Sequence, residues 1–276
     1  MIWGNSPPVF KAKTPREKMC KLAQQLSRDV MRNQTRANNY GWLMYEEAIT
    51  QSIMIALNEK LPSSVLNLNR KVLDTFTGKR MPESQSGADW VMTVNYGSSS
   101  LDFLIQAKRM SENGQYSSVD KTIGKPGPYQ VDELVKTAGR LNVIPAYCFF
   151  NFDFHGLLQH DHDYALRGCT IAWGKQIQKL VAKKTFKFAD CDNIAFPWHR
   201  LFCCKSRILS VGYHGISSTM SNYTHRLMRL KDEEQSFHLT DGIENLKHEF
   251  WTQMDQLFAK TNFNVSTYTY VDLSND

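Results

Sequence analysis

Apolar residues recur at helical spacing through the first sixty residues of the chain. Residues 15–35 predict one helix, and residues 38–61 predict a second helix with a stronger pattern. The second segment carries apolar side chains three or four positions apart, which predict one buried stripe: Trp42, Tyr45, Ile49, Ile53, Ala56 and Leu57. Glu46 falls on this stripe and therefore points inward better than Glu47 does.

The pattern changes to that of strands between residues 64 and 110. The run "SVLNLNRKVLDTF" (64–76) predicts a strand or a pair of strands. In "GADWVMTVNYGSSSLDFLIQAKRM" (87–110), two apolar runs are joined across the Gly-Ser turn "YGSSS". This segment predicts an antiparallel hairpin.

Helical and strand patterns alternate again after the hairpin. A loop rich in Gly and Pro (119–128) precedes a helix (129–142) and then a buried strand (143–152). The helix is expected to turn five apolar side chains inward: Val131, Leu134, Val135, Ala138 and Leu141. Further along, the sequence predicts a strand at 169–173, a helix at 174–183, a loop at 193–204 and a helix at 241–260.

This order of elements predicts an α/β fold. A helix, three strands, a helix and a buried strand are typical of a mixed central sheet flanked by helices on both faces. Residues 40–152 hold this core. Residues 1–39 form a basic helical segment, and residues 153–276 form a C-terminal α/β extension packed on the core, so that we expect one domain overall.

Charge favours a polyanionic partner. The chain has 33 basic and 27 acidic side chains, a net charge of +6. Much of the basic excess lies in the first 40 residues, in "KAKTPREKMCK" and "RDVMRNQTR", although a solvated helix face explains this equally well. The motifs GxxxxGK[ST], GxGxxG and GxSxG are absent, which argues against nucleotide hydrolysis, dinucleotide chemistry and serine-hydrolase activity.

Compartment and cysteine usage give two further expectations. No run of 18 apolar residues and no secretory signal is found, so we expect a cytoplasmic protein with no membrane partner. Six irregularly spaced cysteines favour reduced thiols over a disulfide framework.

Polar residues gather at the buried end of the hairpin. Because strand side chains alternate, Gln106 and Lys108 share a face with Asp102 and Leu104, whereas Arg109 points to the opposite face. Asp89 opens the preceding strand, and antiparallel pairing brings it close to Gln106 and Lys108.

These side chains predict a divalent-metal site that hydrolyses a phosphodiester. Mg²⁺ and Mn²⁺ prefer oxygen ligands, which the Asp89 carboxylate, the Gln106 side-chain oxygen and the Ala107 backbone carbonyl can supply. Lys108 can orient the attacking water and stabilise charge on the phosphate.

The elements "GAD", a hairpin and "QAK" resemble the core of the PD-(D/E)XK nucleases, the restriction-endonuclease-like superfamily, in the variant with glutamine in place of the second acid. The resemblance implies that Glu46, in "YEEAIT", contacts the metal through water. It also implies that Gln130, in "YQVDELVKTA" as in Mrr-like branches, approaches the site.

The resemblance covers residues 40–152, with weaker agreement to about residue 204. The runs "QVDELVKTAGRLNVIPAYCFFN", "GCTIAWG" and "FPWHRLFC" are similar to an uncharacterised bacterial branch of the superfamily. The family's function implies an endonuclease dependent on Mg²⁺ or Mn²⁺, with duplex DNA as substrate, acting as a homodimer or within an anti-phage defence complex.

Two other functions stay open. Gln106 is a neutral ligand and weakens metal binding, so a catalytically degenerate protein that binds nucleic acid or acts as a scaffold is one alternative. An RNA-directed nuclease is the other. In either nuclease, Lys121 and Lys125 could hold the substrate phosphate from the loop before the Gln130 helix.

Remaining candidate residues favour structural roles. Cys191, His199, Cys203 and Cys204 could bind zinc, but their spacing favours buried thiols. The run from His155 through His160, Asp161, His162 and Asp163 is more typical of a solvated loop than of a metal site. Most aromatic residues lie on apolar stripes and are expected in the core rather than as platforms for stacking bases.

Overall fold

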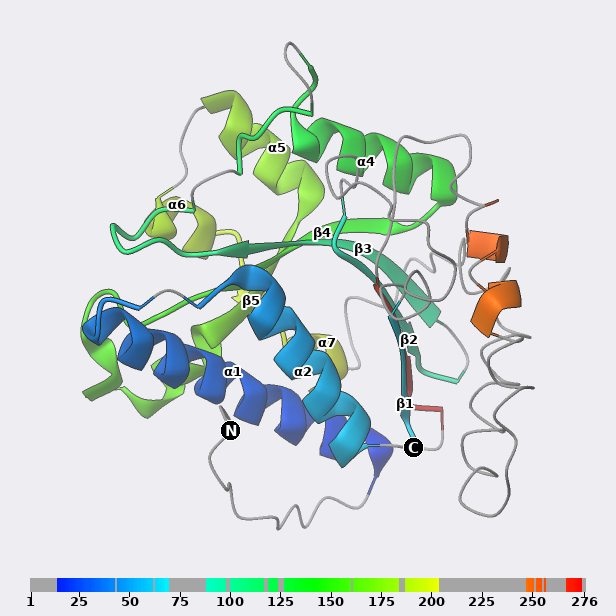
Figure 1. Ribbon diagram of the computed structural model, residues 1–276, viewed down its shortest axis with the longest axis horizontal. Coiled ribbons are helices and arrows are strands. Elements are labelled where there is room, and N and C mark those ends of the chain that lie inside the picture. The colour runs from blue at the N-terminus through cyan, green and yellow to red at the C-terminus, as the bar shows by residue number, and fades with distance from the viewer. Residues whose placement is uncertain are drawn as a thin grey trace.

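The fold is an α/β sandwich around one mixed sheet (Figure 1). The computed structural model describes residues 14–42, 44–61, 63–69, 88–97, 100–116, 119–123, 127–159, 161–183, 187–203, 247–250, 252–254, 256 and 267–274.

Seven strands of the described residues form the sheet, in the order β1-β7-β2-β3-β4-β5-β6. Their bounds are β1 Val65–Asn69, β2 Trp90–Asn95, β3 Ser100–Arg109, β4 Ile144–Phe150, β5 Cys169–Trp173, β6 Phe196–Pro197 and β7 Thr267–Asp272. The pairs β2/β7 and β3/β4 are parallel, and the other neighbours are antiparallel. The predicted mixed sheet and the predicted β2–β3 hairpin are therefore confirmed.

Helices cover both faces of the sheet. In Figure 1, α1 (Pro15–Asn39) and α2 (Glu46–Lys60) lie on one face, and α4 (Gln130–Leu141) and α5 (Gly174–Lys183) lie on the other. Shorter helical segments follow the loops: η2 Leu157–Gln159, η3 His162–Gly168, α6 Phe188–Asp192 and α7 Arg200–Cys203. In the predicted C-terminal helix, the described residues 247–250, 252–254 and 256 are helical.

No helix within the described ranges combines the length and the hydropathy that crossing a bilayer requires.

The first predicted helix is longer than expected, and the second is shorter. Thr14 caps α1 by accepting a hydrogen bond from the Glu17 amide (3.2 Å), and Pro15 occupies the first helical position. Beyond α1, Gly41 adopts a left-handed conformation (φ 68°) that breaks the helical path, and α2 begins only at Glu46.

The predicted burial of Trp42 and Tyr45 is wrong. Both lie in the connection between α1 and α2, where they are 70% and 72% exposed. Helical periodicity assigned them to the buried stripe, but a residue outside the helix does not follow that periodicity. The later members of the stripe, Ile49, Ile53 and Leu57, are buried as expected.

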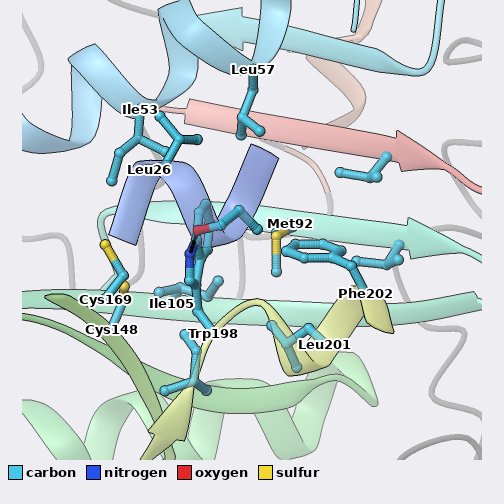
Figure 2. Close-up of a cluster of buried hydrophobic side chains, with 14 of the residues drawn as sticks. Leu26, Ile53, Leu57, Met92, Ile105, Cys148, Cys169, Trp198, Leu201 and Phe202 are labelled. Atoms are coloured by element: carbon cyan, nitrogen blue, oxygen red, sulfur yellow. Dashed lines mark hydrogen bonds between the residues drawn. The ribbon is translucent and has the colours of Figure 1, made fainter. Parts of the chain in front are cut away.

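The core has two halves, one on each face of the sheet. Figure 2 shows part of the half beneath α1 and α2, where Leu26, Ile53 and Leu57 pack towards Met92 and Ile105. On the other half, Val131, Leu134, Ala138 and Leu141 of α4 are buried as predicted, and Val135 is partly buried. Both faces of β3 are therefore covered, with its predicted apolar set, Phe103, Ile105 and Ala107, on the α1/α2 side.

The C-terminal extension is built into the core rather than laid on it. Strand β7 pairs with β1 on one side and with β2 on the other, so the last described strand separates the first strand from the hairpin. Strands β5 and β6 extend the opposite edge. Residues 40–152 and 153–276 thus contribute strands to one sheet, and α1 of the first segment packs on it.

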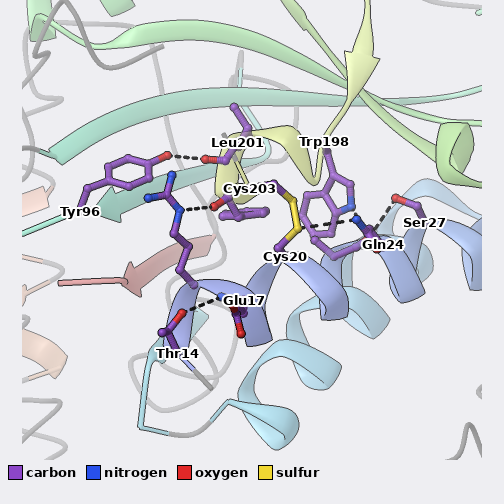
Figure 3. Close-up of a disulfide and its surroundings, with 12 residues drawn as sticks. Thr14, Glu17, Cys20, Gln24, Ser27, Tyr96, Trp198, Leu201 and Cys203 are labelled. Atoms are coloured by element: carbon purple, nitrogen blue, oxygen red, sulfur yellow. Dashed lines mark hydrogen bonds between the residues drawn. A yellow bond between two sulfur atoms is a disulfide. The ribbon is translucent and has the colours of Figure 1, made fainter. Parts of the chain in front are cut away.

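The prediction that the cysteines are reduced thiols is wrong for one pair. Cys20 of α1 and Cys203 of α7 form a disulfide, with Cα atoms 5.2 Å apart (Figure 3). The pair is 183 residues apart in the sequence, so only packing of α7 against α1 brings the two sulfurs together. Cys148, Cys169 and Cys191 are buried free thiols, as expected.

Candidate functional site

Three residues lie side by side across neighbouring strands, at the level where β2 begins: Asp89, Gln106 and Tyr147. The Asp89 amide donates to the Ile105 carbonyl (2.9 Å), which sets Asp89 beside Gln106. Gln106 in turn pairs with Tyr147 of β4 in the parallel register. All three belong to the α4/α5 face of the sheet, since the flanking residues Val91 and Leu104 pack in that half of the core.

Asp89 and Gln106 are in direct contact. Gln106 Nε2 donates to Asp89 Oδ2 (2.5 Å) and to the Ala107 carbonyl (3.3 Å). The Ala107 amide donates to the same Asp89 oxygen (2.6 Å). Gln106 Oε1 is buried and accepts no hydrogen bond in the described part of the chain. A buried acceptor without a partner is costly, so it points to a ligand at this place.

Lys108 completes the group predicted from the hairpin. It lies two residues beyond Gln106 on the same face of β3 and is only 5% exposed. Its charge lowers the pKa of both Glu46 and Asp89, opposing the effect of burial. Lys108 therefore lies within electrostatic range of both carboxyls.

Glu46 reaches the site from the opposite layer. It is the first residue of α2, and its Oε2 accepts a hydrogen bond from the Arg109 amide at the end of β3 (3.0 Å). Burial raises the pKa of Glu46 to about 7, the Lys108 charge lowers it and the Asp89 charge raises it. Glu47 is exposed, so Glu46 is the residue that faces the site. The Arg109 guanidinium instead donates to the Met110 carbonyl (3.1 Å).

The donor set fits a divalent cation. Burial also raises the pKa of Asp89. The Asp89 charge in turn raises the pKa of Glu46, so the two carboxyls interact. A cation would offset their charge and give Gln106 Oε1 a partner. Among the described residues, no three side chains of the types His, Cys, Asp and Glu gather as a metal site. The oxygens of the candidate site belong to two carboxyls, those of Glu46 and Asp89, and to the side-chain amide of Gln106.

Lys121 and Gln130 are neighbours beside this group. The Gln130 amide donates to the Lys121 carbonyl (2.8 Å), and the exposed Lys121 side chain lowers the pKa of Asp89. Gln130 is 8% exposed at the start of α4. Lys125 lies outside the described residues.

Sequence reasoning missed Tyr147. Its hydroxyl is buried without a hydrogen-bond partner in the described ranges, and its pKa is raised by burial and then by Asp89, Asp132 and Glu46. The tyrosine stands in an apolar run that reads only as a buried strand. The polar hydroxyl within that run was the one sequence feature that could have indicated a functional residue. The parallel register that sets Tyr147 beside Gln106 is, however, a tertiary feature.

The two other metal candidates do not assemble. Cys191 packs in the core half under α4 and α5, whereas Cys203 is tied to Cys20 of α1. His199 is nearly buried, and burial, then Arg200 and Arg28, lowers its pKa to about 4. Cys204 lies outside the described residues.

The described side chains of the histidine run are solvent-exposed, as expected, but the run is not all loop, because η3 begins at His162. His155, Asp161 and Asp163 are exposed, and Asp161 caps η3 by accepting from the Asp163 amide (2.8 Å). His160 lies outside the described residues, as does the side chain of His162.

Comparison with protein-family models matches residues 19–264 to DUF6615, described as a family of unknown function. No curated protein and no solved structure matches the chain.

Proposed function

We propose that this chain, which belongs to the family of unknown function DUF6615, is a metal-dependent nuclease with a restriction-endonuclease-like core. The hairpin β2–β3, followed by α4 and by β4 parallel to β3, supports such a core. Strand β7 lies between β1 and β2, where a restriction-endonuclease-like core would pair those two strands directly. On this proposal, the family has inserted β7 into the core sheet.

One observation carries the proposal. The Asp89 carboxylate contacts the Gln106 amide, whose oxygen has no partner among the described residues, and the nearly buried Lys108 lies two residues further along the same face of β3. A second carboxyl, that of Glu46, joins them from α2. Burying charged side chains lowers the stability of the folded protein. Their retention at the sheet therefore favours a functional role, namely chemistry on an anionic substrate.

The residues divide the work as follows. Asp89 and Gln106, with the Ala107 carbonyl, would hold Mg²⁺ or Mn²⁺, and Glu46 would contact it through water. When bound, the cation lowers the pKa of water and polarises the phosphoryl oxygen. Lys108 donates to the attacking water and to the phosphate oxygen on which charge develops.

Protons and substrate are handled around this centre. Glu46, with a pKa of about 7, can accept a proton from water near neutral pH. Lys121 can neutralise a substrate phosphate from the exposed loop. Cutting both strands of duplex DNA requires two such centres, which a homodimer would supply. The resemblance to bacterial nucleases favours a role in defence against phage.

Plasmid digestion by the purified protein tests the proposal. We expect nicking or linearisation with Mg²⁺ or Mn²⁺ and none with a chelator. Lys108→Met keeps the buried stem, removes the charge and should lower the cleavage rate at least about 100-fold. The control is Lys175→Met, which removes a charge from an exposed position on α5. Undiminished cleavage by a folded Lys108→Met protein would refute the assignment.

A second candidate is a non-catalytic nucleic-acid-binding or scaffolding protein. The observation in its favour is the neutral Gln106, which leaves two acidic side chains in the group. This function predicts salt-dependent DNA binding that is indifferent to Mg²⁺, Mn²⁺ and Asp89→Ala. Comparing single-stranded DNA, duplex DNA and RNA as substrates separates the DNA nuclease from an RNA-directed one.

A further inference from the structure

Three large aromatic side chains are exposed in one short connection. Tyr40, Trp42 and Tyr45, in the connection between α1 and α2, are 74%, 70% and 72% exposed. The rings of Tyr40 and Trp42 lie 5.7 Å apart between centroids. These three residues, the aromatic loop, are exceptions to the expectation that most aromatic residues lie in the core, which the other described aromatic residues largely follow. Exposing these three costs stability in water, so the loop is suited to a partner that covers it.

The backbone holds the loop beside the candidate active site. Trp42 N–H donates to the Ala37 carbonyl (2.8 Å), and the left-handed Gly41 makes that turn possible. Tyr45 is the residue that precedes α2, directly before Glu46. Glu46 is fixed to the end of β3 through the Arg109 amide. Trp42 is four residues from Glu46, so their Cα atoms are at most about 15 Å apart.

A basic stripe leads to the aromatic loop along α1. Arg28, Arg32, Arg36 and Tyr40 follow one another at intervals of four residues, which sets them on one side of the helix. Arg32 and Arg36 are exposed, and Arg28 is half-buried. The acids beside the stripe include Asp29, and Asp153, whose amide donates to Thr35 Oγ1 (2.9 Å). Burial raises the pKa of Asp29, and its hydrogen bond with Gln25 and the charges of Arg32 and Arg28 lower it. The arginine stripe therefore keeps a net positive charge.

We propose that the arginine stripe and the aromatic loop bind a single-stranded stretch of nucleic acid and lead it to the site of Glu46, Asp89 and Lys108. The inference rests on the proposed nuclease function and adds that the nucleic acid is held by an unpaired stretch beside the bond that is cut. Arginines at regular spacing suit a phosphate backbone, and exposed aromatic rings stack on bases. Bases inside a duplex are already stacked on their neighbours, so these rings can act only on unpaired ones. A second copy of the chain would oppose one positive stripe with another.

Fluorescence anisotropy with a labelled single-stranded oligonucleotide in chelator tests this inference, because no metal-dependent cleavage occurs there. We expect Trp42→Leu to weaken binding roughly tenfold and Trp42→Phe to retain most of it, since phenylalanine keeps a stacking face. The control is Ile55→Ala, which removes another exposed apolar side chain (57%) from α2. Binding of the duplex of the same sequence should respond to none of these changes. DNA and RNA strands tell which backbone is preferred.

The arginine stripe has its own measurement. Replacing Arg32 and Arg36 together with Ala should reduce the slope of log affinity against log salt by about 1.4 for a single strand. The control removes Lys175 and Lys179, an exposed pair four residues apart on α5, and should leave the slope unchanged.

Failure of this inference and failure of the nuclease proposal give different results. If wild-type protein cleaves but Trp42→Leu and Trp42→Phe bind the single strand equally well, the stacking role is refuted and the nuclease stands. If binding follows the aromatic loop but no metal supports cleavage, the nuclease fails and the binding surface stands. If Trp42→Leu separates an oligomer without changing oligonucleotide affinity, the loop is a contact between copies and the inference is overturned.

Discussion

At the scale of single residues, the site is an arrangement of charges that burial disfavours. Burial raises the pKa of both Glu46 and Asp89, and the Lys108 charge lowers each without cancelling the rise. Without a cation, the Glu46 carboxyl, with a pKa of about 7, favours its protonated form near the acidic end of the physiological range. Binding of a cation, protonation of the carboxyls and the stability of the folded protein are therefore coupled at this site.

Glu46→Gln should change how stability depends on pH. The pKa of Glu46 is about 7 in the folded protein against an ordinary value of 4.5. Its contribution to stability is therefore complete below about pH 4.5 and is lost as the pH rises through about 7. In chelator, wild-type protein should lose about 1–3 kcal/mol more unfolding free energy between pH 4.5 and pH 8 than Glu46→Gln. Urea denaturation at the two pH values measures this, and parallel losses would contradict it.

Gln106→Glu should strengthen metal binding. A third carboxylate adds the negative charge that the site lacks, so we expect roughly tenfold tighter Mn²⁺ binding at pH 8. Isothermal titration calorimetry on metal-free protein is the measurement. Gln24→Glu, on α1, adds the same charge far along the chain and should leave the affinity unchanged. Equal affinity in all three proteins would argue that Gln106 is not a ligand.

Bound metal should also stabilise the protein more at high pH. Protons compete with the cation for Glu46 and Asp89, whose pKa values are both raised. We expect Mn²⁺ to raise the melting temperature clearly at pH 8 and little at pH 5.5, in differential scanning calorimetry. A shift of the same size at both pH values would mean that the ion binds elsewhere.

Single residues were predictable where local rules apply. The alternation of side chains on a strand puts Gln106 and Lys108 on one face, and hairpin pairing brings Asp89 to them. Tyr147 could not be found in this way, because its place beside Gln106 depends on the register between β3 and β4. Nothing within either strand encodes that register.

At the scale of elements, one close approach joins α1 to η3. Gly168, the last residue of η3, lies so close to α1 that an added Cβ would collide with the Ser27 carbonyl oxygen and come within 2.8 Å of the Met31 amide nitrogen. These are backbone atoms of a helix and cannot give way. Packing of α1 on η3 therefore requires glycine at this position.

Gly168→Ala should destabilise the protein by at least about 2 kcal/mol, because the two elements must separate to admit one methyl group. The matched change is Gly139→Ala within α4, where a Cβ meets no atom within 4 Å. It should stabilise the protein by about 0.5–1 kcal/mol through helix propensity. Chemical denaturation of the two variants measures both effects, and similar values would contradict the packing argument.

At the scale of the whole molecule, distant parts of the chain are joined around the sheet. The disulfide between Cys20 and Cys203 ties α1 to α7 (Figure 3), and two hydrogen bonds also hold α7, one from α1 and one from the residue after β2. Arg16 Nε donates to the Phe202 carbonyl (2.9 Å), and the Tyr96 hydroxyl donates to the Leu201 carbonyl (2.5 Å). The disulfide closes most of the chain into one loop.

Reduction of this disulfide should lower the unfolding free energy by about 2–5 kcal/mol, since the unfolded chain then regains the freedom of a very long loop. Urea denaturation with and without reductant measures the difference. Cys20→Ser with Cys203→Ser should reproduce the reduced value and be insensitive to reductant. A wild-type protein whose stability ignores reductant would show that the bond contributes nothing.

The sequence by itself determined the local order of this protein: the helices, the β2–β3 hairpin, the apolar faces of β3 and α4, and the contact between Asp89 and Gln106, with Lys108 on the same face of β3. Hydrophobic periodicity encodes such features within a few residues. Only the tertiary structure decided the insertion of β7 between β1 and β2, the Cys20–Cys203 bond, the place of Tyr147 and the exposure of the aromatic loop. Each depends on segments far apart in the chain, whose pairing is fixed by the free energy of the assembled sheet and not by any local pattern.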